Sequence, residues 1–371
     1  MRLVRSPNIV AYWRANRFCL EEFVRRSRIT ALPLVVELLA EFGRPRSSRS
    51  AALSFLAYTP ASVEREIRRL AKLGFLVPAA DRTARRDVAA EWRGSFPAAH
   101  FHFASRDVSY ITDPAKLTRH FRHRLAEEPQ PPLYKSYPGR PRLHLPDRPS
   151  TENGTSLKSA LERRRTVREF SRRKLVPLRD FSSVMRWTWG QTGWADAGMF
   201  GRLLLKTSPS AGARHPIECY VLAWGVEGLP AGLYHYNVRE DCLERLRRGD
   251  LRDEAVRLAA GQRWIRQAAF LCVMTVVAAR LFWKYASDDS YRLFFLDAGH
   301  LAQTFALLAT ARGLGAFTTA SMKESRIEKL LGLDGVREFP VYLCGAGMVR
   351  PGRRGTRKHR KAATGAPART S

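Results

Sequence analysis

Cysteines are few in this sequence, and none of them are paired at metal-binding spacing. The five cysteines are scattered, with no Cys-x-x-Cys pair: Cys19, Cys219, Cys242, Cys272 and Cys344. An odd, scattered set is not the pattern of a disulfide framework, and a structural zinc site needs clustered ligands. The cysteine pattern therefore predicts a protein of a reducing, cytoplasmic compartment that holds no metal.

Long apolar runs are also missing. The longest, Ala268–Ala279, is too short to cross a bilayer and is rich in β-branched residues, which favours a buried strand. Charged residues interrupt the N-terminal stretch, so no signal peptide is expected there. With 45% hydrophobic residues and a mean hydropathy of -0.31, the composition predicts a soluble globular protein without a membrane partner. Its 371 residues favour about two domains.

Acidic residues are scarce relative to basic ones. The chain has 64 Lys and Arg against 34 Asp and Glu, for a formal net charge of +30. Such a charge suits a nucleic-acid or acidic-peptide partner, but no aromatic-plus-basic repeat accompanies it, so nucleic-acid binding is not favoured. Part of the charge lies in residues 351–371, a basic tail predicted to be disordered because its composition cannot bury enough apolar surface.

Residues 1–127 carry the pattern of a small helical domain. Ile29–Gly43 has helical spacing, and a second helix is expected to begin with Thr59 as N-cap and Pro60 at its first position. Gly74 is expected to end that helix, and Phe75–Val77 reads as a strand. This order resembles a winged-helix module. Such modules bind DNA, and they also dock peptides when fused to modifying enzymes, so both roles stay open.

A proline-rich segment, residues 128–150, is expected to be an extended linker to a second domain over 151–350. In that domain we expect helices over 156–165, 178–190, 251–259, 291–312 and 325–331. Strands are expected over 219–224, around 232–236, and over 268–277 and 341–345. This alternation predicts an α+β architecture with a central sheet.

Two segments of this domain have the chemistry of a ligand site. Arg163–Phe170 ends a helix with several guanidinium groups and the hydroxyl of Thr166, a set that matches phosphate oxygens. Ser208–Pro216 precedes a strand, and there Pro209 restricts φ while Gly212 permits a positive φ. Small neighbours leave backbone N–H groups uncovered for a polar ligand edge. Alone, each segment is also compatible with an ordinary basic helix end or loop.

Taken in order, the motifs resemble those of a known family. They are Arg-Arg-Thr-x-Arg-x-Phe at 164–170, Pro-Ser-Ala-Gly-Ala-Arg-His-Pro at 209–216, Gly-Leu-Tyr-His-Tyr at 232–236, and Asp-Ala-Gly-His at 297–300 on a helix ending Gly-Leu-Gly. The set is similar to the nitroreductase-like FMN flavoproteins, and within them to the SagB-type, ThcOx-like azoline dehydrogenases, over about residues 155–350. The resemblance implies a mixed or antiparallel central sheet flanked by helices, FMN as cofactor, and a homodimer. It also implies oxidation of thiazoline or oxazoline rings to thiazoles or oxazoles in a ribosomally made precursor peptide, beside a cyclodehydratase.

The resemblance further implies which residues contact FMN. The phosphate, ribityl chain and pyrimidine edge would be held by Arg164, Arg165, Thr166 and Arg168, with Arg350 or Arg353 after the last strand completing the phosphate site. The isoalloxazine would lie along Pro209, Ser210, Ala211, Gly212 and Ala213, with the turn over 313–320, including Gly315, Thr318, Thr319 and Ala320, near N5. Two departures count against simple nitroreductase activity: an asparagine is common where Ala213 stands, and the usual Gly-Gly or Glu-Gly pair near Ala320 is missing.

Lys284 and Tyr285 match the Lys-Tyr dipeptide on which azoline dehydrogenases depend. Aromatising an azoline removes a proton and a hydride from neighbouring carbons, so a base is needed beside the substrate. Which of the two takes the proton stays open, and a packed aromatic-lysine corner is the alternative interpretation. His300 is expected to be a structural core histidine.

Two other functions remain as alternatives. The first is an NAD(P)H-dependent nitro or flavin reductase, although no NAD(P)H-binding fingerprint is present. The second is a flavin-sensing DNA-binding regulator, suggested by the pattern of residues 29–77 and by the positive charge.

Overall fold

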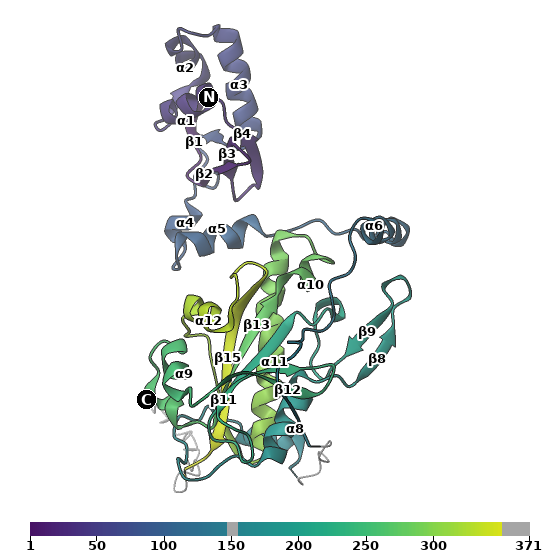
Figure 1. Ribbon diagram of the computed structural model, residues 1–371. Helices are drawn as coiled ribbons and strands as arrows, with labels where there is room; N and C mark the ends of the chain where they lie inside the picture. The colour runs from purple at the N-terminus through teal and green to yellow at the C-terminus, as the bar shows by residue number, and fades with distance from the viewer. Residues whose placement is uncertain (147–154, 351–371) are drawn as a thin grey trace, which may run out of the picture. The chain divides into compact units, whose positions relative to one another are not determined.

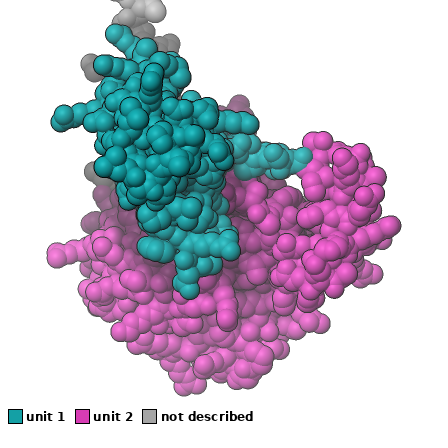
Figure 2. All heavy atoms as spheres, turned by 90° about the horizontal axis from the view of Figure 1, so that it is seen from above, with its two compact units in different colours: residues 1–110 teal, residues 111–371 magenta. Residues whose placement is uncertain are grey.

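The computed structural model describes residues 1–146 and 155–350, which form two compact units, residues 1–110 and 111–371 (Figures 1 and 2). The boundary at Tyr110 differs from the expected boundary near 127, because helix α6 (Pro114–Glu127) belongs to the second unit. Its buried Phe121 packs against Phe200 and Trp283, with ring centroids 5.0 and 6.5 Å away. The basic tail and the junction at 147–154 lie outside the described residues.

The first unit contains two antiparallel three-stranded sheets and five helices among its described residues. One sheet has the order β5-β1-β6, with β1 (Arg2–Arg5), β5 (Arg46–Ser47) and β6 (Leu76–Pro78). The other is a meander of β2 (Ile9–Arg14), β3 (Arg17–Glu22) and β4 (Ser27–Thr30). The helices are α1 (Pro33–Glu41), α2 (Ser48–Ser54), α3 (Pro60–Lys72), α4 (Val88–Glu91) and α5 (Phe96–Ala104).

The start of α3 confirms the predicted N-cap. The Ser62 N–H donates to Thr59 Oγ1 at 3.4 Å, and Pro60 occupies the first turn. The helix predicted from Ile29 instead begins at Pro33, because Ile29 pairs with Leu20 in the β3-β4 ladder. Cross-strand pairing thus overrides the helical spacing there. The order α2, α3, β6 is compatible with a winged-helix module, and that assignment stays a prediction.

The second unit is built on a seven-stranded antiparallel sheet, which confirms the predicted central sheet flanked by helices (Figure 1). The strand order is β14-β15-β13-β10-β11-β12-β7. The strands are β7 (Arg142–His144), β10 (Ile217–Ala223), β11 (Gly232–Asn237), β12 (Cys242–Arg248), β13 (Phe270–Val277), β14 (Leu314–Thr319) and β15 (Glu338–Met348). The central strands β10 and β13 are buried along almost their whole length, which means that both faces of the sheet are covered.

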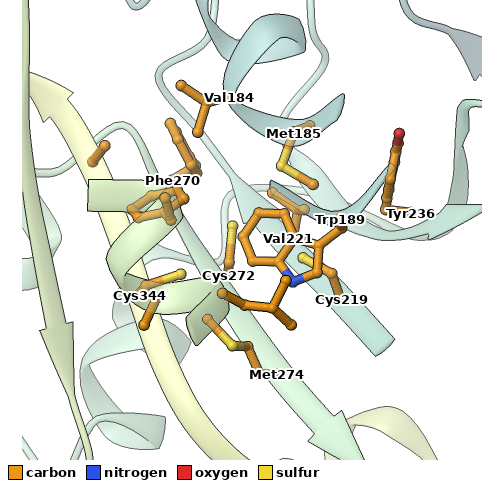
Figure 3. Close-up of a cluster of buried hydrophobic side chains, with 14 of the residues drawn as sticks. Val184, Met185, Trp189, Cys219, Val221, Tyr236, Phe270, Cys272, Met274 and Cys344 are labelled. Carbon is orange, nitrogen blue, oxygen red and sulfur yellow. The ribbon is translucent and has the colours of Figure 1, made fainter. Parts of the chain in front are cut away.

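Helices cover the two faces separately. On one face, α8 (Leu178–Trp189) and α11 (Tyr291–Ala311) pack against alternate residues of β10 and β13, and Figure 3 shows Trp189 and Met185 of α8 against Cys219 and Cys272. On the other face, α9 (Arg252–Leu258) and α12 (Glu324–Leu331) cover the remaining alternate residues. The remaining elements are α7 (Leu157–Arg163), α10 (Ala278–Phe282), the β8 (Gly193–Asp196) and β9 (Arg202–Leu205) hairpin, and four 3-10 turns.

Two segments differ from their predicted structure. The expected linker 128–150 instead contributes β7 to the sheet beside β12, and Glu128 C=O accepts a hydrogen bond from Trp283 Nε1 at 3.1 Å; its last residues, 147–150, lie outside the described part. The expected turn over 313–320 is strand β14, paired with β15 from Leu314 to Thr319, with only its first residue, Gly313, at positive φ (72°). Aromatic and β-branched residues favour that strand.

The long helix α11 is strongly apolar. By length and composition alone, Asp288–Ala311 qualifies as a helix able to cross a membrane. Its Phe294, Leu301 and Phe305 are buried in the core beneath the sheet, which is the position of a core helix.

Replacing Phe305 by alanine tests this core. The ring is fully buried between Trp189 and Phe270, so Phe305→Ala is expected to lower the free energy of unfolding by about 3–5 kcal/mol in urea denaturation. The exposed Val336→Ala is the control and should change it by less than about 0.5 kcal/mol. Equal losses in both variants would contradict the packing described.

Candidate functional site

Hydrogen bonds hold the 208–216 loop against α11. Ser210 Oγ donates to Asp297 Oδ2 at 2.5 Å and accepts from the His215 N–H at 2.9 Å, while the Ala211 N–H donates to Asp297 Oδ1 at 3.3 Å. One carboxylate therefore binds both a side chain and the backbone of the loop. These contacts give the loop one defined conformation.

The loop backbone lies repeatedly in the left-handed region. Gly212 has φ of 57°, which confirms the predicted positive φ, and Ala213 and His215 have φ of 53° and 44°. Residues that carry a Cβ adopt this region at a cost, and such positions cluster at functional sites. The conformation is thus held by the surrounding contacts rather than by the residue types alone.

Lys284 and Tyr285, which follow α10, converge on this loop. A Cβ placed on Gly212 would lie 2.5 Å from Tyr285 Oη and 2.9 Å from Lys284 Nζ. The phenol and the amine therefore meet over the one residue of the loop that has no side chain. The structure brings together the predicted catalytic pair and the predicted loop, which are distant in sequence.

Burial shifts the pKa values of Lys284 and Tyr285 in opposite directions. Burial lowers the pKa of Lys284, and the positive charge of Arg214 lowers it further. Burial raises the pKa of Tyr285, Arg214 opposes this rise, and Asp297 adds to it. A larger fraction of Lys284 is therefore a free amine near neutral pH, whereas Tyr285 stays a phenol.

Aromatic rings enclose the amine. The Phe200 ring, in the turn between β8 and β9, has its centroid 5.1 Å from Lys284 Nζ, and Phe200 packs edge-on against Trp283 at 6.3 Å. The Phe200 ring covers one side of the Lys284 amine and so contributes to its burial.

A second feature is a cavity beside the arginine segment, here called the arginine cavity. It is lined by Arg164, Thr166, Gly299, Ala302, Gln303, Ala306, Ala316, Phe317, Thr318 and Tyr342. Thr166 forms a parallel bridge with Ala316, and the Val167 N–H donates to Ala316 C=O at 2.9 Å. This pairing brings the arginine segment to β14. Three predicted FMN contacts, Arg164, Thr166 and Thr318, therefore lie together.

Other predicted contacts do not line this cavity. Arg165 is exposed and donates to Arg164 C=O, and Arg168 lies over the Trp264 ring at 5.7 Å. Thr319 Oγ1 accepts from Gln262 Nε2 at 3.1 Å, and Gly315 packs against Val167. Ala320 and Arg350 are exposed beyond the ends of their strands. Arg353 lies outside the described residues.

The arginine cavity and the 208–216 loop lie on opposite faces of α11. Asp297 and Thr304 contact the loop, whereas Gly299 and Gln303 line the cavity. Positions two residues apart on an α-helix point about 200° apart. The two predicted halves of the flavin site are therefore separated by a helix within one chain.

The donors in the arginine cavity fit a flavin. The half-buried Arg164 guanidinium has no hydrogen bond or ion pair to another described residue, and the Thr166 hydroxyl is exposed at the rim. Small residues of α11 and β14 leave room beside them. An unpaired guanidinium next to a flat, small-residue wall suits a phosphate or a pyrimidine edge joined to a planar ring.

Several residues of the site lie where the sequence does not indicate them. His300 is exposed on α11, so its expected role as a core histidine is wrong, and Asp297 serves the loop instead. Phe200 and Arg214 were not considered as site residues, since nothing in the local pattern indicates what they contact. The sequence places Asp297 close to His300, but the residue that Asp297 binds, Ser210, lies 87 positions away in the chain.

The antiparallel sheet with its helical layers defines an α+β fold, and the arginine cavity lies beside its edge strand β14. The chain belongs to the nitroreductase family, whose model matches residues 161–348. It is 27% identical over 327 residues to the trifolitoxin-processing protein TfxB of Rhizobium leguminosarum bv. trifolii, covering 82% of this chain and 85% of TfxB. It is 30% identical over 191 residues to a nitroreductase-type protein of Methanocaldococcus jannaschii, covering 52% of this chain and 90% of that protein.

A crystal structure of a nitroreductase-type protein from Anabaena variabilis superposes with a TM-score of 0.53 at 23% identity, which supports the fold alone. The match covers 68% of this chain and spans about half, 47%, of that structure's chain.

Gly212→Ala tests the convergence over the loop. The new Cβ would displace Tyr285 Oη and Lys284 Nζ and would sit at positive φ, so we expect a larger loss of unfolding free energy than for Gly139→Ala. Gly139 is the matched control, because it has a φ of 77° and nothing within 4 Å of its added Cβ. Both losses are measured by urea denaturation. If the two variants lose the same stability, the pair does not meet over Gly212.

Proposed function

We propose that this protein is an FMN-dependent dehydrogenase that oxidises thiazoline or oxazoline rings to thiazoles or oxazoles in a ribosomally made precursor peptide. The observation that carries the proposal is the convergence of Lys284 Nζ and Tyr285 Oη over Gly212 in a nitroreductase-family fold. The similarity to a trifolitoxin-processing protein over most of both chains supports a peptide as the substrate.

The reaction removes a proton from one ring carbon and a hydride from the adjacent ring carbon. The electron pair of the C–H bond that loses the proton forms the new ring double bond, and the hydride leaves with the pair of the other C–H bond. Bound FMN supplies the acceptor for the hydride. Lys284 accepts the proton at Nζ, since burial and Arg214 favour its free amine. Tyr285 remains protonated and donates a hydrogen bond to the substrate from the same side. Phe200 excludes water from the amine.

Two copies of the chain would complete the flavin site. Arg164 and Thr166 of one copy would hold the phosphate and the polar ring edge, and the 208–216 loop of a second copy would cover the ring, because the two lie on opposite faces of α11 within one chain. Exposed apolar side chains on α11 support this dimer: Phe295 is 46% and Leu296 is 56% exposed.

A cyclodehydratase is the chemical class of partner that must precede this enzyme, since it makes the azoline that the site oxidises. The first unit, with its compact core around Ile67 and Leu70, would dock the peptide. In that role it acts as a binding module, and the chemistry stays with the second unit.

Arg164→Ala tests the flavin site. Losing the unpaired guanidinium is expected to yield largely colourless protein, measured as the flavin-to-protein absorbance ratio. Arg165→Ala is the matched control, since that side chain is exposed and does not line the cavity, and it should keep its flavin. Full flavin in Arg164→Ala would refute the assignment.

Lys284→Ala and Tyr285→Phe test the chemistry. Both should retain flavin but lose turnover of an azoline peptide, by about 100-fold or more for the lysine, because a positioned base contributes that much. Product is followed as a mass loss of two hydrogens per ring. Lys329→Ala, on the exposed side of α12, is the control and should be active. Activity retained in both site variants would exclude them as the catalytic pair.

An NAD(P)H-dependent reductase is the competing function, and the identity to the Methanocaldococcus protein favours it. Anaerobic mixing separates the two. Rapid bleaching of the bound flavin by NADPH, with none by an azoline peptide, would replace the proposed function by the reductase.

A further inference from the structure

Arg214 is a buried cation without an acidic partner in the described part of the chain. It is 1% exposed, its Nε donates to Arg280 C=O at 3.0 Å, and its Nη1 donates to Gln130 Oε1 at 2.8 Å. The Trp283 ring centroid lies 5.2 Å from its Cζ. Among the described residues, no carboxylate lies within ion-pair distance of it, and its Nη2 is buried without a hydrogen bond. Burying a charge without an ion-pair partner costs free energy, so the position of this guanidinium calls for a functional explanation.

The backbone on both sides of Arg214 is held in an unfavourable conformation. Ala213 and His215 both have positive φ, and this turn places the arginine side chain inside the protein. Gln130 then joins the guanidinium to the β8–β9 turn, because Gln130 Nε2 donates to Phe200 C=O at 3.0 Å. Strained backbone of this kind is typical of residues whose position serves a function.

Three elements face Lys284 and Tyr285: the 208–216 loop, α11 and the β8–β9 turn. The loop contributes the Arg214 cation, two residues after Gly212 and 5.2 Å from the ring of Trp283, the residue before Lys284. Helix α11 contributes Asp297, which binds the loop at Ser210, and the β8–β9 turn contributes the uncharged ring of Phe200. Arg214 is the charged group that acts on both members of the pair. A fixed positive charge disfavours an ammonium and favours a phenolate.

We propose that Arg214 is a positioning residue whose buried guanidinium keeps Lys284 a free amine and ready to accept the substrate proton. The inference rests on the proposed function for its role in turnover, but its effect on Lys284 exists without any substrate. When the proton arrives at Nζ, the nearby guanidinium repels the new ammonium and favours its release before the next cycle.

Pulse acetylation of the full-length protein tests this directly. A lysine reacts with acetic anhydride only as its unprotonated amine, so the pH of half-maximal Lys284 acetylation, assigned to that residue by peptide mass spectrometry, reports its protonation. We expect Arg214→Gln to move that pH upward and to slow Lys284 labelling at neutral pH on the order of tenfold. Arg214→Lys, which keeps a positive charge, should stay close to the wild type.

Arg186→Gln is the matched control, because Arg186 is also a largely buried arginine but pairs with Asp241, in the turn between β11 and β12. Its Lys284 labelling should not change. An Arg214→Gln protein that is folded and labels Lys284 at the wild-type pH overturns the proposal.

If Arg214→Gln does not fold, two other measurements decide. Gln130→Ala releases the Nη1 bond and should also move the Lys284 midpoint upward, and no movement overturns the proposal. The proposal is also overturned if Lys284 of the wild-type protein reaches half-maximal labelling at the same pH as the exposed Lys329.

Turnover provides a separate readout. In Arg214→Gln the acidic limb of kcat/KM against pH should shift to higher pH, and activity should recover in alkaline buffer. A purely structural role would lower the rate at every pH. Wild-type protein without azoline turnover would refute the proposed function, whereas the labelling experiment would still decide the role of Arg214.

Discussion

The hydrogen bonds of the Asp297 carboxylate are the constraint on which the site depends. Through Ser210 Oγ and the Ala211 N–H they hold the 208–216 loop on α11. The left-handed conformation of Gly212 and its neighbours follows from this attachment, and so does the open space over Gly212 into which Lys284 and Tyr285 extend. Burial raises the pKa of Asp297, while its bonds to the loop oppose that rise. The carboxylate thus links a core helix to the loop and, through the loop, to Lys284 and Tyr285.

Helix α11 divides the site as well as supporting it. One face carries the loop and the other lines the arginine cavity, because residues two positions apart on a helix point in nearly opposite directions. Its length and apolar composition are explained by burial beneath the sheet on one side. The exposed Phe295 and Leu296 extend that apolar character to the surface, where a second copy would cover them.

A network of buried charges joins the sheet to the segment around Pro132, which precedes the sheet in the chain. His235 lies between Glu218 and Glu244, at 2.9 and 3.0 Å, and Arg280 binds Glu218 at 2.6 Å. Burial opposes the charged form of Glu218, but Arg280 and His235 outweigh it and lower its pKa to about 2. Arg280 also donates to Pro132 C=O at 2.9 Å. The segment expected to be a linker is therefore part of the folded unit and contributes to the environment of the site.

Local signals were sufficient for much of the fold. The sequence correctly predicted the N-cap Thr59 with Pro60, the β-branched strand β13 and the long apolar helix α11. Each of these features depends on a few neighbouring residues. Strand β14 and strand β7 were not predicted, since a strand is stabilised by partners far along the chain. The ordered motifs likewise indicated the family, and they located Lys284, Tyr285 and the loop without showing that they touch.

By itself, the sequence determined most of the helices and central strands, the family and the residue types available at the site, because helix capping, hydrophobic periodicity and motif order are properties of neighbouring residues. Only the tertiary structure decided which of those residues meet. It placed Arg164 and the loop on opposite faces of one helix, removed Arg168 from the arginine cavity to the Trp264 ring, and put the buried Arg214 beside the Lys284 and Tyr285 pair. Burial and electrostatic fields arise from segments brought together by folding, so no local pattern contains them.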